Sequence, residues 1–135
     1  MQFDLYQEEC ARTADLQAGL LNEAKMRLVN GKTLSLLEQG GVLHAFQVLI
    51  ENAIGKSKHC LKALNVSVPV SAYDCFVSLH QQGKITQDDL AQWNAAIGLR
   101  NRIVHDYMNV DMQFVYGLIM ADKHAFVANF LRQPI

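Results

Sequence analysis

Leu99-Arg100-Asn101-Arg102-Ile103-Val104-His105-Asp106-Tyr107 is the most informative stretch of this sequence. It belongs to a segment in which positions three and four residues apart form one stripe: Leu90, Trp93, Ile97, Arg100, Val104 and Tyr107. This spacing is typical of a helix that packs one face against other helices. All of these positions are apolar or aromatic except one, which is an arginine. The stripe predicts a helix that starts at a Thr86 cap and ends near Met108.

Arg100 is the exception within this stripe. An unpaired guanidinium in an apolar interior costs several kcal/mol, so a buried arginine needs a partner or access to water. Two solutions remain open. Either Arg100 pairs with a buried acid of its own fold, for which Glu51 is a candidate, or this part of the helix faces a cleft or a second subunit.

Other polar side chains gather near Arg100 on the helix. At about 100° per residue, Asn101 and His105 lie together on one shoulder, about 100–140° around from Arg100. Tyr107 returns to the line of Arg100, whereas Arg102 points away and is expected to be a solvated charge. A guanidinium, an amide, an imidazole and a phenol on neighbouring stripes can bind and protonate a phosphate-like group.

The composition is that of an ordinary globular domain. The chain has 135 residues, half of them hydrophobic, and a formal net charge of −1, so no global basic field indicates a nucleic-acid binder. Three cysteines without a Cys-x-x-Cys pair are typical of reduced packing thiols. No apolar run reaches the ~18 residues of a membrane span, and the N-terminus does not resemble a secretory signal. We therefore expect a cytoplasmic protein with no membrane contact.

Caps and apolar repeats divide the chain into five helices, over about 3–29, 33–65, 72–82, 86–108 and 112–131. In the first, Leu5, Leu16 and Leu20 belong to the stripe that is expected to face inward, and Asn30-Gly31 is a stop signal. In the second, Gly40-Gly41 is a candidate position for a break. We expect an all-α fold, an antiparallel up-and-down bundle of four main helices and one short helix, forming a single domain over residues 1–135.

The segment from Arg100 to Tyr107 reads Arg-x4-His-x-Tyr, with a polar residue directly after the arginine. This pattern resembles the signature of HEPN domains, in particular the HepT-like toxins of HEPN–MNT toxin–antitoxin pairs. Two further segments are similar to that family: Gln47-Val48-Leu49-Ile50-Glu51 and Val68-Pro69-Val70-Ser71-Ala72-Tyr73-Asp74-Cys75-Phe76. The expected helix layout matches the family over nearly the whole chain.

This resemblance implies a homodimer in which the motif helices of two subunits face each other across a cleft. Active relatives are metal-independent endoribonucleases, and a cognate MNT-type nucleotidyltransferase antitoxin neutralises them by adding AMP to the motif tyrosine. No cofactor and no metal are implied. Transferred to this sequence, the catalytic residues are Arg100, Asn101 and His105, the AMPylated residue is Tyr107, and Arg102 and Glu51 are supporting candidates.

The residue types suit this chemistry. Cleavage of RNA without a metal uses the 2′-hydroxyl as the nucleophile, and a histidine such as His105 can take up or donate the proton. A fixed cation such as Arg100 can stabilise the negative charge on phosphorus, and Asn101 can orient the imidazole or the phosphate.

Other readings stay open. The bundle could be a non-catalytic subunit that binds nucleotide or presents Tyr107 to a nucleotidyltransferase, or a purely structural dimer with a degenerate site. The remaining histidines show no spacing that indicates a metal site. The densest basic cluster contains Lys56, Lys58 and Lys62; it is expected to be a solvated helix face, with a supporting RNA contact as the alternative.

Overall fold

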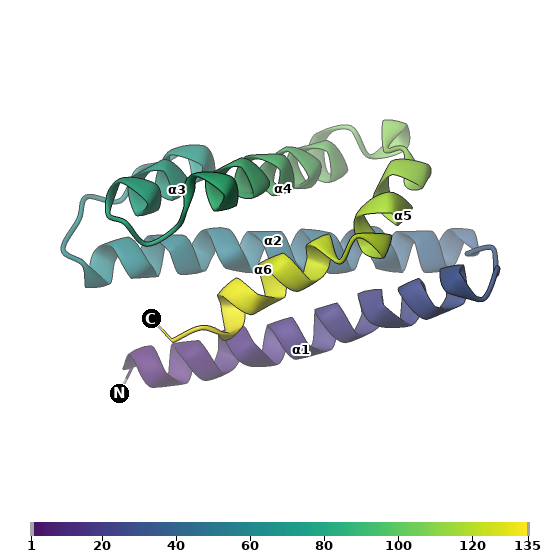
Figure 1. Ribbon diagram of the computed structural model, residues 1–135, viewed down its shortest axis with the longest axis horizontal. Helices are drawn as coiled ribbons and strands as arrows, with labels where there is room; N and C mark the ends of the chain where they lie inside the picture. Colours follow the sequence, from purple (N-terminus) through teal and green to yellow (C-terminus); the bar gives the residue numbers. More distant parts are fainter. Residues whose placement is uncertain (1, 135) are drawn as a thin grey trace.

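The computed structural model describes residues 2–134, and all their regular structure is helical. The elements are α1 (Gln2–Val29), α2 (Leu36–Ala63), α3 (Ala72–Gln81), α4 (Gln87–His105), the short 3-10 helix η1 (Tyr107–Asn109), α5 (Met112–Met120) and α6 (Lys123–Arg132). In Figure 1, α1 and α2 run antiparallel, α3 and α4 lie on the opposite side of α2, and α6 packs against α1 and α2. The expected all-α bundle is confirmed. Within residues 2–134, each helix is too short or too polar to cross a lipid bilayer.

The helix starts follow local side-chain chemistry. Thr86 Oγ1 accepts a hydrogen bond from the Asp89 amide at 3.0 Å, and Asp89 Oδ2 accepts one from the Thr86 amide at 3.0 Å, which satisfies two amides that have no partner within the helix. Ser71 and Asp111 cap α3 and α5 in the same general way. The second helix begins later than predicted, after a capping box at Ser35 rather than at Thr33.

The predicted helix over 112–131 is two helices, which is a correction to the expected four-plus-one layout. Asp122, between α5 and α6, adopts a left-handed conformation with φ of 56°. Aspartate tolerates this conformation better than most residues, and here Lys25 of α1 donates to its carboxylate at 2.8 Å. This contact spans 97 residues of sequence, so no local pattern announces the break.

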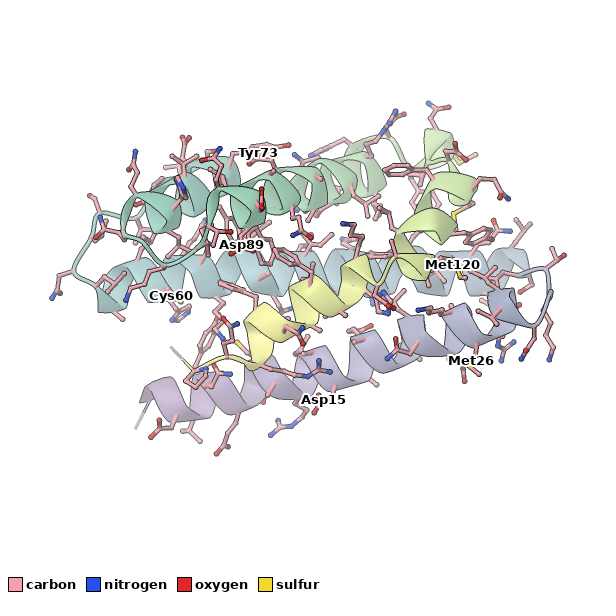
Figure 2. The ribbon with its side chains drawn as sticks, in the orientation of Figure 1. Asp15, Met26, Cys60, Tyr73, Asp89 and Met120 are labelled. Carbon is pink, nitrogen blue, oxygen red and sulfur yellow. The ribbon has the colours of Figure 1, made fainter. Side chains whose placement is uncertain are left out.

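The predicted inward face of α1 is wrong for three of its leucines. Leu5, Leu16 and Leu20 are exposed, and so is Met26, which Figure 2 shows on the side of α1 that faces away from α2. The side chains that α1 buries are mostly smaller: Cys10, Ala14, Ala18, Leu21 and Ala24. Small residues let α1 approach both α2 and α6 closely, and this determines which face is buried.

An aromatic cluster joins α3, α4 and α6 in the core. Trp93 stacks on Phe76, with ring centroids 4.3 Å apart, and meets Phe130 edge-on at 4.9 Å. Trp93 and Ile97 are both buried, as the stripe on this helix predicts. The first half of α4 is therefore held firmly against its neighbours, and this anchors the second half, which carries the motif.

His124 gives the folded state a pH dependence that can be measured. Its ring is fully buried, Nε2 donates to Asn22 Oδ1 at 2.7 Å, and Nδ1 has no partner among the described residues. Burial lowers the pKa of this histidine, while the nearby Asp122 and Lys25 act in opposite directions. The folded state therefore resists protonation below pH 6.5, where the unfolded chain takes up a proton.

We expect the free energy of unfolding to fall as the pH is lowered from 7 to 5, by at most about 1.4 kcal/mol per pH unit from this one group. Urea unfolding at several pH values measures it. The variant His124→Gln should show a shallower dependence, while His80→Gln, at a less buried histidine, should keep it. Equal slopes in all three proteins would contradict the assignment.

Candidate active site

Arg100 on α4 forms an ion pair with Glu51 on α2. Its Nε donates to Glu51 Oε2 at 2.9 Å and its Nη2 lies 2.8 Å from the same oxygen, while Gln47 Nε2 approaches that oxygen at 3.4 Å. The pair is partly open to water, since 28% of the Arg100 side chain and 36% of the Glu51 side chain are exposed. The sequence offered two ways to accommodate the charge of Arg100, and the structure has both. Arg100 has an acidic partner in Glu51, and it also faces a space that is open to solvent.

Asn101 holds the other side of the same guanidinium. Arg100 Nη1 donates to Asn101 Oδ1 at 3.2 Å. An arginine carries five N–H donors, and these contacts use one each on Nε, Nη1 and Nη2. Two donors, one on each terminal nitrogen, are left without a partner among the described residues and can donate to a phosphate.

The second half of α4 is uncovered on the shoulder that carries the motif. Val104 was predicted at the buried seam, but 39% of it is exposed, and His105 is exposed as well. Leu99 and Ile103 are buried instead. The sequence pattern did not predict this exposure, because the apolar stripe continues along the whole of α4. The neighbouring helix α3 has only 10 residues, so it is too short to cover the second half of α4.

His105 is the last residue of α4, and no hydrogen bond joins its side chain to Arg100 within residues 2–134. The following residue, Asp106, has φ of −145° and ends the helix, and its amide bonds to the Arg102 carbonyl. The side chain of His105 forms no hydrogen bond within residues 2–134, and His105 is not among the residues around the Arg100 cavity. A single chain thus brings together Arg100, Asn101 and Glu51, with His105 further along the same exposed shoulder. Arg102 is exposed, as predicted.

Tyr107 lies over a different part of α2 from Arg100. Its hydroxyl is 3.7 Å from the position that a Cβ would take at Gly40, and half of the residue is exposed. Gly40 precedes Glu51 by eleven residues, or about 16 Å along the helix at 1.5 Å per residue. The expectation that Tyr107 returns to the Arg100 line is wrong, because α4 ends at His105. No break occurs at Gly40-Gly41, where α2 is continuous.

Arg100 and Asn101 border a polar cavity of about 580 Å³ between α2, α4 and the start of α3. Lys58, Ser71 and Tyr73 also line it. The apolar pattern of α3 predicts that Tyr73 faces inward, but 38% of this residue is exposed. The sequence did hold a signal for Lys58, which follows Glu51 by seven residues and so lies on the same face of α2 two turns later.

Lys56 is buried and does not belong to the basic surface cluster in which the sequence places it. Its Nζ donates to the carbonyls of Phe130 at 2.7 Å, Leu131 at 3.2 Å and Gln133. These carbonyls belong to the end of α6 and the residue after it, where the helix dipole is negative. Burial lowers the pKa of Lys56, and the neighbouring Cys10 and Cys60 oppose this shift. The expected solvated patch is therefore reduced to Lys58 and Lys62.

Among residues 2–134, no three His, Cys, Asp or Glu side chains converge in a way that could hold a metal ion. The three thiols of Cys10, Cys60 and Cys75 are free, and burial raises the pKa of Cys60 and of Cys75. The side chains near the motif that remain available to a ligand are the following: Arg100, Asn101, His105, Lys58, Tyr73 and Tyr107.

Comparison with known proteins gives consistent matches. The family model described as Ribonuclease HepT-like matches residues 15–132. The mRNA nuclease HepT of Shewanella oneidensis is 30% identical over 81 residues, which cover 60% of this chain and 61% of that protein. The chain thus aligns with less than two thirds of this curated relative.

Solved structures share the fold. A tri-AMPylated Shewanella oneidensis HEPN toxin in complex with MNT antitoxin superposes with a TM-score of 0.74 and 22% identity, over 90% of this chain and 93% of that one. A toxin–antitoxin structure with AMP-PNP gives a TM-score of 0.78 and 19% identity, over 93% of this chain and 97% of that one. At these identities the likeness establishes the arrangement of helices.

Proposed function

The chain belongs to the ribonuclease HepT-like family, and on that premise we propose that it is an endoribonuclease toxin that cleaves RNA without a metal ion. One observation carries the proposal. Arg100 keeps two N–H donors free beside the uncovered shoulder of α4, on which Asn101 and His105 also lie. A phosphodiester placed on this shoulder can meet both a fixed cation and an imidazole.

The reaction uses a nucleophile that RNA itself supplies. The 2′-oxygen attacks the adjacent phosphorus, and the bond from phosphorus to the 5′-oxygen of the next nucleotide breaks. One proton must leave the 2′-hydroxyl and one must reach the departing 5′-oxygen, and His105 can take either role. Arg100 stabilises the added negative charge on the phosphoryl oxygens. The products are a 2′,3′-cyclic phosphate and a 5′-hydroxyl.

We propose that the active site forms in a homodimer. Within one chain His105 does not line the cavity that Arg100 borders, and Val104 leaves apolar surface exposed on the same half of α4. A second copy placed on this shoulder would cover Val104 and bring two sets of Arg100, Asn101 and His105 into one groove. Two imidazoles would then be present, one to accept a proton and one to donate it.

The test is direct. Purified protein is incubated with single-stranded RNA in excess chelator, and the ends of the products are analysed. Cleavage that leaves 2′,3′-cyclic phosphates supports the proposal. The alternative, a non-catalytic subunit that binds nucleotide or presents Tyr107 to a nucleotidyltransferase, predicts no cleavage together with nucleotide binding.

For the regulation of this activity, we propose that an MNT-type nucleotidyltransferase antitoxin transfers AMP to Tyr107. The phenolic oxygen attacks the α-phosphorus of ATP and pyrophosphate leaves, so the tyrosine gains a bulky anion at the end of the motif helix. The partly exposed side chain of Tyr107 supports this assignment. The related HEPN toxin whose structure is AMPylated was found in complex with MNT antitoxin.

Tyr107→Phe should abolish this modification, because it removes the accepting oxygen and keeps the ring. When the protein is incubated with a cognate nucleotidyltransferase and ATP, mass spectrometry should detect added AMP on the natural chain and none on the variant. Tyr116→Phe, on α5, serves as the matched control and should be modified like the natural chain. Addition of AMP to Tyr107→Phe at the natural level would show that the acceptor lies elsewhere.

A further inference from the structure

The cavity beside Arg100 extends well beyond the guanidinium. Arg100 and Glu51 lie at one end of it, and Lys58 lies about 10 Å further along α2, two turns of helix away. The start of α3 forms the opposite wall with Ser71 and Tyr73. A space of about 580 Å³ exceeds what one phosphate needs and is large enough for a nucleotide.

The charges in this cavity favour an anion. Two cations, Arg100 and Lys58, and one carboxylate, Glu51, line it, so their sum is +1 although the whole chain has a net charge of −1. Glu51 is already paired with Arg100. Within the described residues no carboxylate forms an ion pair with Lys58, which leaves its ammonium available to a ligand.

Tyr73 adds an aromatic surface to the same wall. Its hydroxyl lies 3.9 Å from the position that a Cβ would take at Gly98, so the side chain reaches from α3 to α4, and 38% of the residue is exposed. Figure 2 shows it on the outer side of the α3–α4 pair, away from α1 and α6. Val70, three residues earlier in the sequence and also on the wall, is 96% exposed. A base can stack on an exposed aromatic ring and contact an exposed aliphatic side chain, while the cationic cavity attracts its phosphate.

We propose that this cavity is a subsite for one nucleotide of single-stranded RNA beside the cleaved bond, in which a base stacks on Tyr73 and Lys58 binds a flanking phosphate. The inference rests on the proposed function, because it places the cleaved phosphate at Arg100. The base must be splayed out of any helix to reach Tyr73, so the subsite selects unpaired RNA over duplex. Stacking is tolerant of base identity, so the subsite contributes affinity more than sequence preference.

Binding is measured separately from cleavage, with a fluorescein-labelled single-stranded RNA of ten nucleotides whose 2′-oxygens are methylated so that it cannot be cut. Tyr73→Ala should weaken binding about tenfold, and Tyr73→Phe should retain it because the ring remains. Lys58→Gln should weaken binding and reduce the slope of log affinity against log salt by about 0.7. Lys62→Gln, at an exposed lysine on the same helix outside the cavity, is the matched control and should bind like the natural chain.

The outcomes separate this inference from the proposed function. Natural affinity in Tyr73→Ala, with circular dichroism showing an intact fold, overturns the subsite, and cleavage by the natural chain would then still stand. If binding depends on Tyr73 but the natural chain does not cleave RNA, the result supports the subsite and contradicts the proposed nuclease activity. Failure of the natural chain to bind the oligonucleotide, or equal losses in Lys58→Gln and Lys62→Gln, also overturns the subsite.

Discussion

Replacing His105 with alanine is expected to lower the rate of RNA cleavage by about two to four orders of magnitude, which is the usual contribution of a positioned general acid or base. His105 is the one imidazole on the exposed shoulder that also carries Asn101, at the end of the helix that holds Arg100. Its side chain makes no hydrogen bond within residues 2–134, so the loss of the imidazole should leave the bundle intact. The measurement is the single-turnover rate on labelled RNA, with the unfolding midpoint as a check of the fold.

The matched control is His80→Ala, on α3 and outside the Arg100 cavity. It should cleave at the natural rate. If His105→Ala also cleaves at the natural rate, the proposed proton transfer is wrong, whatever the other variants do. In a homodimer, mixing His105→Ala with Arg100→Ala subunits provides a further test, because sites completed across the interface should regain part of the activity.

Arg100 alone is a less clean probe of the mechanism. Arg100→Ala removes the cation, but it also leaves Glu51 without its partner between α2 and α4. Because the pair is partly exposed, the structural cost should be small, about 1 kcal/mol or less. Comparing Arg100→Ala with Glu51→Gln separates the two effects, since only the first removes the donors proposed to bind phosphate.

The largest effect on stability is expected from Lys56→Met. The ammonium places its three N–H donors on three carbonyls at the end of α6, and the side chain is buried. Methionine fills a similar volume but cannot donate, so these carbonyls lose their partner. Each unsatisfied buried group costs about 1–3 kcal/mol, offset in part because a charge is no longer buried. We expect a loss of about 2–4 kcal/mol in the free energy of unfolding.

Urea unfolding followed by circular dichroism measures this loss, and Lys62→Met is the control on the same helix. Lys62 is exposed, and its replacement should change stability by about 0.5 kcal/mol or less. Because Lys56 joins α2 to the C-terminal end of α6, hydrogen exchange in Lys56→Met should increase first at residues 126–132. Equal stability of the two variants would show that the buried contacts of Lys56 contribute nothing.

Much of the candidate site could be predicted from the sequence, because it depends on one helix. Arg100, Asn101 and His105 belong to α4, whose Thr86 cap is local, and the Glu51 partner was named as one of two solutions for a cation in an apolar stripe. The catalytic roles remain predictions. The cavity wall formed by Tyr73 was not predicted, because the apolar pattern of a ten-residue helix does not reveal which of its faces a neighbour covers.

The sequence by itself determined what depends on neighbours within a few residues: the helical content, the caps at Ser71, Thr86 and Asp111, and the order of residues along the motif helix. Only the tertiary structure decided which faces are buried. It left Leu5, Leu16 and Leu20 of α1 exposed and broke the last predicted helix at Asp122. It also took Lys56 out of a surface cluster to bind carbonyls more than 70 residues away. The physical reason is that a cap needs only a side chain and a nearby amide, whereas burial depends on which distant helix packs there.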